Sequence, residues 1–421
     1  MNWLSQLQRS EKQTLVACFA GYAVDSFDYM IYSFMIPTLV LVWHMSKSEA
    51  GLIATASLLS SALGGWLAGI LADKYGRVRM LQFTIGWFCI FTFLSGLTHS
   101  PGQLLVTRTL QGLGMGGEWS VGSVLIAEII RPEHRGKAVG VVQSSWAVGW
   151  GLAAIMYAVV YSFLPEVVAW RVLFLLGVVP AALIVVVRRH VKESSVYLET
   201  KRKSDSGKLD ANFLRIFSPS MLKTTILASL VATGLQGGYY GVTTWLPTYL
   251  KTVRHLSVFN TSGYLVVLIT GSFLGYLAGA YCCDRLGRRK TFVIFAVAST
   301  VLVTTYMLIP ITNTQMLLLG LPLGMSVSGV FSGMGAFLSE LFPNEIRGSG
   351  QGFCYNFGRA IGAVFPALIG FLSTRMGLGR AIGIFAGAAY GVLVIAALSL
   401  PETKGKGFHE EAQVDQAALV K

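Results

Sequence analysis

Charged residues are scarce in this chain. Only 13% of its 421 residues are Asp, Glu, Lys or Arg, whereas 53% are hydrophobic. A soluble protein of this length would carry about twice that charged fraction, so the composition excludes an ordinary water-soluble protein. The five cysteines fall within apolar stretches without metal-ligand spacing and are interpreted as packing residues. No Ser-His-Asp arrangement, zinc-ligand spacing or phosphate-binding loop is found, so we predict neither an enzyme nor a metal site.

Long apolar runs are what the chain has instead. About twelve of them are long enough to span a bilayer. Helices are the expected structure, because they satisfy their own backbone groups in lipid. We therefore predict an all-α integral membrane protein with twelve transmembrane helices. The predicted spans lie near residues 15–40, 51–72, 80–98, 103–126, 137–161, 170–188, 223–250, 259–282, 291–310, 315–338, 349–372 and 380–399.

The net charge of +13 is concentrated in alternate connections between these spans. Connections rich in Lys and Arg face the cytoplasm in membrane proteins, which places both termini inside. The basic balance thus indicates topology, and nucleic acid is not expected as a partner. The basic connections are those around 74–79, 131–137, 188–223 and 285–290.

Two motifs each occur twice in the chain, and the two copies are separated by almost the same number of residues. Asp73 and Arg77 are matched by Asp284 and Arg288, 211 residues later. Glu128-x6-Arg135-Gly is matched by Glu340-x6-Arg347-Gly, 212 residues later. This repeat predicts two six-helix bundles related by an axis along the membrane normal, with the substrate site between them near the midplane. We place the bundles at 1–188 and 223–400, a cytoplasmic linker at 189–222 and a cytoplasmic tail at 401–421.

The repeated charges lie near the predicted cytoplasmic helix ends. Ion pairs there could break as the two bundles rock against each other; a topology signal combined with a helix cap is the simpler alternative. The candidate gating residues are Asp73, Arg77, Glu128, Arg135, Asp284, Arg288, Glu340 and Arg347.

Glycines accompany the first copy of the repeat. Gly64, Gly65 and Gly69 are expected to permit close contact between helices. Gly76 is expected to permit a tight turn between two spans.

Ionisable residues inside the predicted spans point to a transport pathway. Asp25 and Asp28 share one face of the first span, and Tyr32 continues that face. Two neighbouring carboxylates are not easily ionised together in a low dielectric, so at least one should bind a proton. In the fourth span, Arg108 could pair with one of these acids in a single conformation; a fixed ion pair is the alternative. Glu118 is a second proton site, a substrate-orienting group or a static hydrogen-bonding group.

Arg359, in the eleventh predicted span, is the candidate for holding a substrate carboxylate. A guanidinium matches carboxylate oxygens bidentately, and Tyr355 and Asn356 precede Arg359 by one helical turn. A salt bridge to an acid of the other bundle is the alternative. Further candidates for the substrate site are Gln143, Trp146, Gln236, Tyr239 and Tyr32. Gln236 and Tyr239 lie 211 residues after Asp25 and Asp28, so only the first bundle carries the acid pair and proton handling is expected to be asymmetric.

Several of these motifs resemble those of the major facilitator superfamily. Gly69–Arg79 resembles its loop between spans two and three, Arg108–Gly116 its fourth-span motif, and Leu400–Gly405 its tail after the last span. Asp25-x-Phe-Asp28 resembles the acidic pair of aromatic-acid and sialate/carboxylate proton symporters. Gly114–Trp119 and Gly352–Gly362 are similar to motifs of the sialate and monocarboxylate group.

The resemblance implies a monomer in the bacterial inner membrane that imports an organic anion with protons by alternating access. The proton is the coupling ion, and no cofactor is implied. Lactate-like acids, sugar or sialic acids and aromatic acids all remain open as substrates. A proton-coupled sugar, polyol or drug transporter is an alternative, although Gly140–Gly151 lacks the Gly-Pro motif that drug antiporters commonly carry in span five. A membrane receptor that does not transport is an alternative of another class.

Overall fold

The computed structural model describes residues 3–179, 191, 193, 213–343 and 346–404, without the side chains at 73, 127, 132–136, 213, 259 and 348. All regular elements in this part are helical. The first half contains α1 (Trp3–Gln6), α2 (Arg9–Val42), α3 (Lys47–Tyr75), α4 (Arg77–Gly96), α5 (Pro101–Ile129), α6 (Pro132–Phe163) and α7 (Glu166–Leu176). The second half contains η2 (Phe213–Phe217), α10 (Leu222–Thr252), α11 (Val258–Leu286), α12 (Arg288–Leu308), α13 (Asn313–Gly329), η3 (Val330–Gly333), α14 (Met334–Glu340), α15 (Arg347–Gly362), α16 (Val364–Met376) and α17 (Leu378–Ser399).

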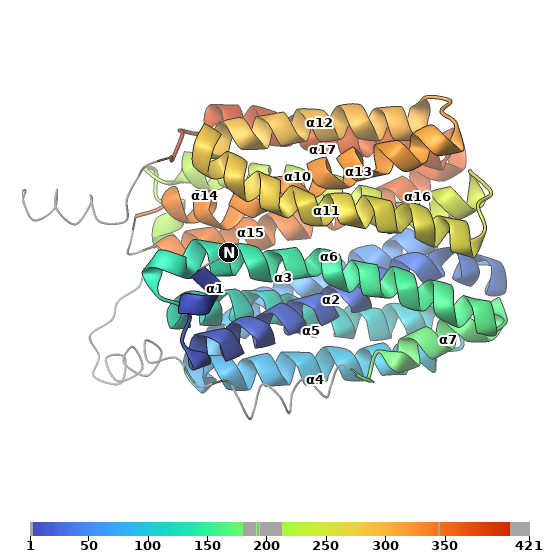
Figure 1. Ribbon diagram of the computed structural model, residues 1–421, viewed down its shortest axis with the longest axis horizontal. Helices are drawn as coiled ribbons and strands as arrows, with labels where there is room; N and C mark the ends of the chain where they lie inside the picture. Colours follow the sequence, from blue (N-terminus) through green and yellow to red (C-terminus); the bar gives the residue numbers. More distant parts are fainter. Residues whose placement is uncertain (1–2, 180–190, 192, 194–212, 344–345, 405–421) are drawn as a thin grey trace, which may run out of the picture.

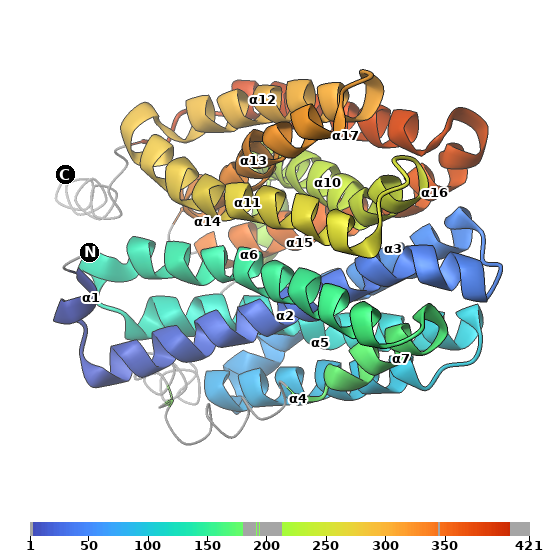
Figure 2. The same cartoon turned by 45° about the vertical axis from the view of Figure 1, so that its right-hand side comes forward.

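These helices form two bundles that lie side by side (Figures 1 and 2). Helices α2 to α7 pack together in one bundle, and α10 to α17 pack in the other. The twelve predicted spans each coincide with helical segments. Two spans are interrupted: the tenth by η3, and the eleventh between α15 and α16. The sixth is described as far as residue 179, with α7 ending at Leu176, and most of the predicted linker lies outside the described residues.

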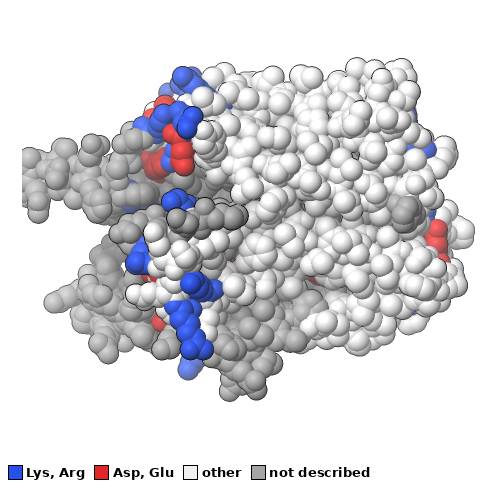
Figure 3. Space-filling model, viewed as in Figure 1, with Lys and Arg blue, Asp and Glu red and all other residues white. Residues whose placement is uncertain are grey.

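The outer surface has an apolar band that is suited to contact with lipid. Figure 3 shows charged side chains near the two ends of the molecule and a wide uncharged band between them. Large apolar side chains in this band point outward, among them Ile90, Val301 and Ile395. Such an apolar belt matches a lipid environment. We call the end with Lys74, Arg77, Arg131, Arg285 and Arg288 the basic end, and the end with Glu49, Glu166, Lys251 and Arg254 the opposite end.

Eight helical segments of the described part are apolar and long enough to cross a membrane. Three long helices, α2, α5 and α10, are outside that set because they carry many polar residues. All three nevertheless lie in the interior, and α10 is buried continuously from Val231 to Leu250. Their lower hydropathy therefore reflects their position between other helices instead of against lipid.

Glycines set the close packing within each bundle. A Cβ at Gly116 of α5 would overlap the carbonyl of Ser61 on α3. A Cβ at Gly112 of α5 would overlap the carbonyl of Ser57 on α3, and at the corresponding place in the second bundle a Cβ at Gly324 of α13 would overlap the carbonyl of Leu268 on α11. The predicted close contacts are also found at Gly64, where a Cβ would overlap the Leu113 carbonyl, and at Gly65, where a Cβ would lie 2.8 Å from Ser120 Oγ. The expectation for Gly69 was wrong, since nothing lies within 4 Å of the site of its Cβ.

The two copies of the repeated loop have the same backbone geometry. Gly76 has φ 108° and Gly287 has φ 99°, a region that side chains disfavour. Each glycine ends one helix and directly precedes the next, so the predicted tight turn is confirmed and occurs in both bundles.

The two bundles contact each other from the centre of the molecule to the opposite end. Thr55 Oγ1 donates to the Ala363 carbonyl at 2.6 Å. At the opposite end, Lys251 Nζ lies 2.9 Å from Glu166 of the first bundle. Helix α3 also packs along α16. The structure is thus closed at the opposite end.

We expect Gly116→Ala to destabilise the protein, because the added methyl group forces α5 away from α3. Overpacking of this kind costs about 1–3 kcal/mol. The melting temperature of the purified protein in detergent should fall. Gly140→Ala in α6 is the matched control, since nothing lies within 4 Å of that position; its melting temperature should be unchanged or slightly higher. Equal melting temperatures for the two variants would contradict the packing argument.

Candidate functional site

An acid and an arginine meet inside the first bundle. Arg108 on α5 and Asp28 on α2 are 0% and 2% exposed, and Arg108 Nη1 lies 3.6 Å from Asp28 Oδ2. Thr92 Oγ1 donates to Asp28 Oδ1, and Gln111 Nε2 donates to Oδ2. Both oxygens of Asp28 therefore have hydrogen-bond donors other than Arg108.

The guanidinium of Arg108 is held loosely in comparison. None of its nitrogens has a hydrogen-bond partner among the described residues. Its other neighbours are the rings of Tyr32 and Phe174, 5.4 and 5.8 Å from the guanidinium carbon. Burying such a charge is costly, and a direct bond to Asp28 would lower that cost. The pair is thus close enough to attract but is not locked together.

Asp25 and Glu118 are buried separately from this pair. Both are 1% exposed, and each has one carboxyl oxygen without a hydrogen-bond partner in the described part of the chain. Gly21 makes room for Glu118, because a Cβ there would overlap Glu118 Oε1. Asp25 and Asp28, although neighbours in sequence, therefore have different surroundings.

Arg359 on α15 is a buried cation with neutral partners. It is 3% exposed, and it donates to Ser61 Oγ at 3.0 Å, Gln236 Oε1 at 3.3 Å and the Tyr355 hydroxyl at 3.5 Å. No described carboxylate forms an ion pair with it. Ser61 belongs to the first bundle, so Arg359 lies at the interface between the bundles. The predicted alternative, a salt bridge across that interface, is not seen among the described residues.

Aromatic side chains surround the space near Arg359. Trp146 Nε1 on α6 donates to the Tyr239 hydroxyl on α10 at 2.7 Å. Tyr239 also packs edge-on against Tyr240 and Phe331. Trp119 on α5 and Tyr355 on α15 stack with ring centroids 4.1 Å apart and an 11° angle between the rings. The two bundles thus meet through aromatic pairs at the centre of the molecule.

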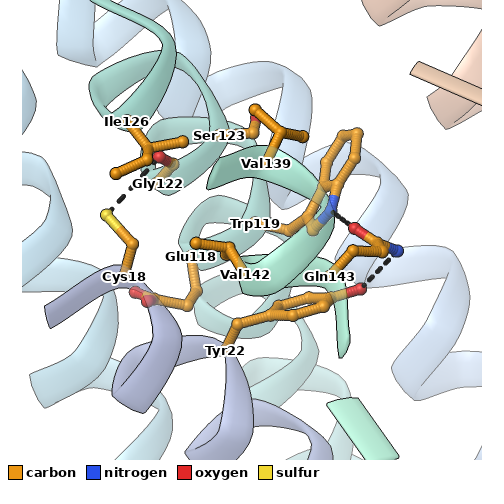
Figure 4. A pocket seen from close by; sticks show the side chains of 10 residues that line it. All are labelled: Cys18, Tyr22, Glu118, Trp119, Gly122, Ser123, Ile126, Val139, Val142 and Gln143. Carbon is orange, nitrogen blue, oxygen red and sulfur yellow. Dashed lines mark hydrogen bonds between the residues drawn. The ribbon is translucent and has the colours of Figure 1, made fainter. Parts of the chain in front are cut away.

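A small cavity lies beside Glu118 and Trp119 (Figure 4). Its volume of about 20 Å³ holds roughly one water molecule. Across it, Trp119 Nε1 donates to Gln143 Oε1 at 3.1 Å, and Gln143 Nε2 donates to the Tyr22 hydroxyl at 3.4 Å (Figure 4). The lining residues are Cys18, Tyr22, Glu118, Trp119, Gly122, Ser123, Ile126, Val139, Val142 and Gln143.

Not every predicted substrate residue contacts Arg359. Tyr32 donates to the Ala50 carbonyl at 2.8 Å and lies beside Arg108. Asn356 donates to Gly352 of its own helix, and its Oδ1 lies near Gly65 of the first bundle. Gln143 contacts Trp119 and Tyr22, as described above.

The predicted gating residues form ion pairs within each bundle at the basic end. Arg77 Nη2 lies 3.4 Å from Glu128, and the equivalent Arg288 Nη2 lies 3.1 Å from Glu340. Arg288 also pairs with Asp284 at 3.3 Å. Arg347 donates to the Ser339 carbonyl at 3.0 Å. The side chains of Asp73 and Arg135 lie outside the described ones.

Two further acids at this end were missed by sequence reasoning. Glu193 accepts the backbone N–H groups of Arg77 and Val78, and Glu402 accepts those of Arg288 and Arg289. Each acid therefore caps the helix after the repeated loop. They lie 209 residues apart, close to the shift of the other motifs, and this spacing could have revealed them.

The cap at Glu402 has an electrostatic consequence. Partial burial raises the pKa of this carboxyl, but hydrogen bonds from backbone N–H groups, led by that of Arg288, outweigh burial and leave the pKa below its usual value. A lowered pKa means that the folded state favours the ionised form. The stabilisation is therefore present at neutral pH and is lost as the pH falls through the acidic range.

Sequence comparisons identify the family of this arrangement. The profile of the Major Facilitator Superfamily matches residues 18–319 and 266–420, almost the whole chain. The chain belongs to the major facilitator superfamily. This confirms the predicted family and the fold class of two helical bundles that span a membrane. Members of this superfamily are transporters, so the chain is a membrane transporter.

Individual relatives agree with membership in the superfamily. A probable 4-methylmuconolactone transporter of Cupriavidus pinatubonensis is 41% identical over 98% of this chain and 96% of its own length. The cis,cis-muconate transport protein of Acinetobacter baylyi is 30% identical over 93% of this chain and 94% of its own. The solved structure of the proton:xylose symporter XylE bound to 6-bromo-6-deoxy-D-glucose has a TM-score of 0.77 at 19% identity, over 96% of this chain and 99% of that one. At that identity the structural likeness concerns the fold alone.

The buried pair of the first bundle gives a stability prediction. Asp28→Ala leaves Arg108 buried without its counter-charge, and breaking a buried pair in this way costs roughly 3–5 kcal/mol. We expect a large fall in melting temperature, part of which should be recovered in Asp28→Ala/Arg108→Gln, where neither charge remains. Thermal unfolding of the single and double variants measures this coupling. Strictly additive effects would show that the two charges do not interact.

Proposed function

We propose that this transporter imports a small organic anion together with protons. The observation that carries the proposal is Arg359, a buried guanidinium at the interface of the bundles whose described hydrogen-bond partners are all neutral. A buried cation of this kind is costly unless an anion reaches it during the working cycle. A substrate carboxylate supplies that anion and fits the two-pronged guanidinium.

The body of the substrate is proposed to be flat and unsaturated. The aromatic faces of Trp119 and Tyr355 lie beside Arg359, with 5.9 and 5.1 Å from its guanidinium carbon to the ring centroids. Rings of this kind favour planar, conjugated partners. The relatives named as transporters of 4-methylmuconolactone and cis,cis-muconate support this class, since both compounds are unsaturated organic acids or their lactones.

Proton coupling is proposed to rest on Asp28 and Arg108. An ionised Asp28 attracts Arg108, whereas a protonated Asp28 no longer does, and the difference can favour one conformation over another. Asp25 and Glu118 are candidate sites for further protons, because each is buried with an unpartnered carboxyl oxygen. Neutralising these groups and Arg359 lowers the cost of closing the path around the substrate.

The basic end is proposed to face the cytoplasm of a bacterial cell, with both termini on that side and the protein in the inner membrane as a monomer. The excess of Lys and Arg at this end supports the orientation. The opposite end, closed by Glu166 and Lys251, would then face the periplasm. The ion pairs of Arg77 and Arg288 are proposed to gate the cytoplasmic side.

The substrate is best found by thermal shift, because a specific ligand raises apparent stability. We expect cis,cis-muconate, a muconolactone or nicotinate to raise the melting temperature of the purified protein, and lactate or xylose to have less effect. Arg359→Lys should lose most of this shift, since an ammonium lacks the planar fork. Arg375→Lys in α16, at the opposite end, is the control and should keep it. Retained binding in Arg359→Lys would remove the assigned carboxylate site.

Transport in proteoliposomes tests the coupling. Parent protein should accumulate the identified anion when the outside is more acidic, because protons enter with it. Asp28→Asn should lose accumulation and retain exchange of labelled for unlabelled anion, which needs no net proton movement. Glu49→Gln is the control, since Glu49 is an exposed acid at the opposite end with no assigned role, and glutamine can keep its capping contact with Ser46. Undiminished accumulation by Asp28→Asn would show that this acid does not couple.

A further inference from the structure

Trp119 and Tyr355 form a stacked aromatic pair at the interface between the two bundles. The two rings come from different bundles and lie in parallel contact, 4.1 Å between centroids. Tyr355 precedes Arg359 by one turn, which places it about 6 Å nearer the basic end along α15. The stacked pair therefore lies between Arg359 and the basic end.

The cavity beside Glu118 lies next to Trp119, on the other side of the aromatic pair from Arg359. Trp119 itself lines this cavity, and Ile126 and Val139 line it nearer the basic ends of α5 and α6. Figure 4 shows Trp119 at one side of the cavity, in contact with Gln143. The aromatic pair thus lies between Arg359 and this cavity, whose lining belongs to α2, α5 and α6 of the first bundle.

We propose that Trp119 and Tyr355 form the inner gate of the transporter, and that Gln143 positions Trp119 in its closed orientation. The proposal rests on the function proposed above only in taking Arg359 as the carboxylate site. Opening requires the rings to separate, because one ring moves with each bundle. It would join the space around Arg359 to the cavity beside Glu118.

The contacts of Arg359 explain how substrate would release this gate. Nη2 of Arg359 donates to the Tyr355 hydroxyl at 3.5 Å, and the guanidinium lies over both rings. A carboxylate that binds two guanidinium N–H groups competes for these donors. The cation is also neutralised, which weakens its attraction to the ring faces. Anion binding therefore removes two interactions that hold Tyr355 against Trp119.

Gln143 links the gate to the side chains around the cavity. It accepts from Trp119 at 3.1 Å and donates to the Tyr22 hydroxyl at 3.4 Å. Gln143 is therefore interpreted as a positioning residue, in place of the substrate contact predicted from the sequence. Since Glu118 directly precedes Trp119 on α5, the gate is adjacent to a candidate proton site.

Thiol accessibility tests the gate without any substrate. Ser61→Cys, in full-length protein whose five native cysteines are replaced, puts a reporter thiol beside Arg359. A membrane-impermeant methanethiosulfonate is added to oriented vesicles from one side at a time. Trp119→Ala and Tyr355→Ala should each raise the labelling rate from the basic end about tenfold, the order expected for losing one aromatic pair. Labelling from the opposite end should not change.

Conservative and remote variants complete the test. Trp119→Phe keeps a ring and should label more slowly than Trp119→Ala. Trp66→Ala, on the exposed face of α3, should match the parent. The double variant should label about as fast as either single variant, well below the product of their two rate increases, because both changes disrupt one contact. Labelling that stays unchanged, or that rises from both sides equally, would overturn the gate. If labelling behaves as expected while Arg359→Lys still binds anion, the gate stands and the carboxylate assignment fails.

Discussion

Burying charge among membrane helices is the constraint on which this structure depends. Each ionisable group removed from water must find a counter-charge, a hydrogen-bond donor or a working partner. Thr92 and Gln111 donate hydrogen bonds to Asp28, whereas the guanidinium of Arg108 beside it has no hydrogen-bond acceptor among the described residues. Protonation of Asp28 removes the negative charge that attracts Arg108, so the position of Arg108 can change with the protonation of Asp28.

The helices that carry these groups are sheltered by the others. Helices α2, α5 and α10 are outside the set of apolar spans, and most of their polar side chains are buried among the other helices. Glycines such as Gly116 bring the surrounding helices close enough to exclude water. Close packing and buried charge are therefore two aspects of one arrangement, since a loosely packed bundle would hydrate Arg108 and weaken its attraction to Asp28.

The duplicated bundles share their ends and differ at their centres. The turn at Gly76 recurs at Gly287, and the cap at Glu193 recurs at Glu402. At the centre, the acids of the first bundle are replaced by Gln236 and Tyr239, which contact Arg359 and Trp146 instead. The ends of the two bundles therefore retain the same structure, which suits a motion in which the bundles rock against each other. At the centres, proton handling is proposed for the first bundle and anion binding for the second.

The sequence by itself determined the spans, the repeat, the turn at Gly76 and the burial of Asp25, Asp28, Arg108, Glu118 and Arg359. These follow from local composition and from periodicity along one helix. Tertiary structure alone decided that Arg108 approaches Asp28, that Arg359 has no described acid beside it, and that Gln143 contacts Trp119. It also brought Trp119 against Tyr355, 236 positions away. Periodicity fixes which face of a helix a residue occupies, but the partner across that face depends on how distant helices pack.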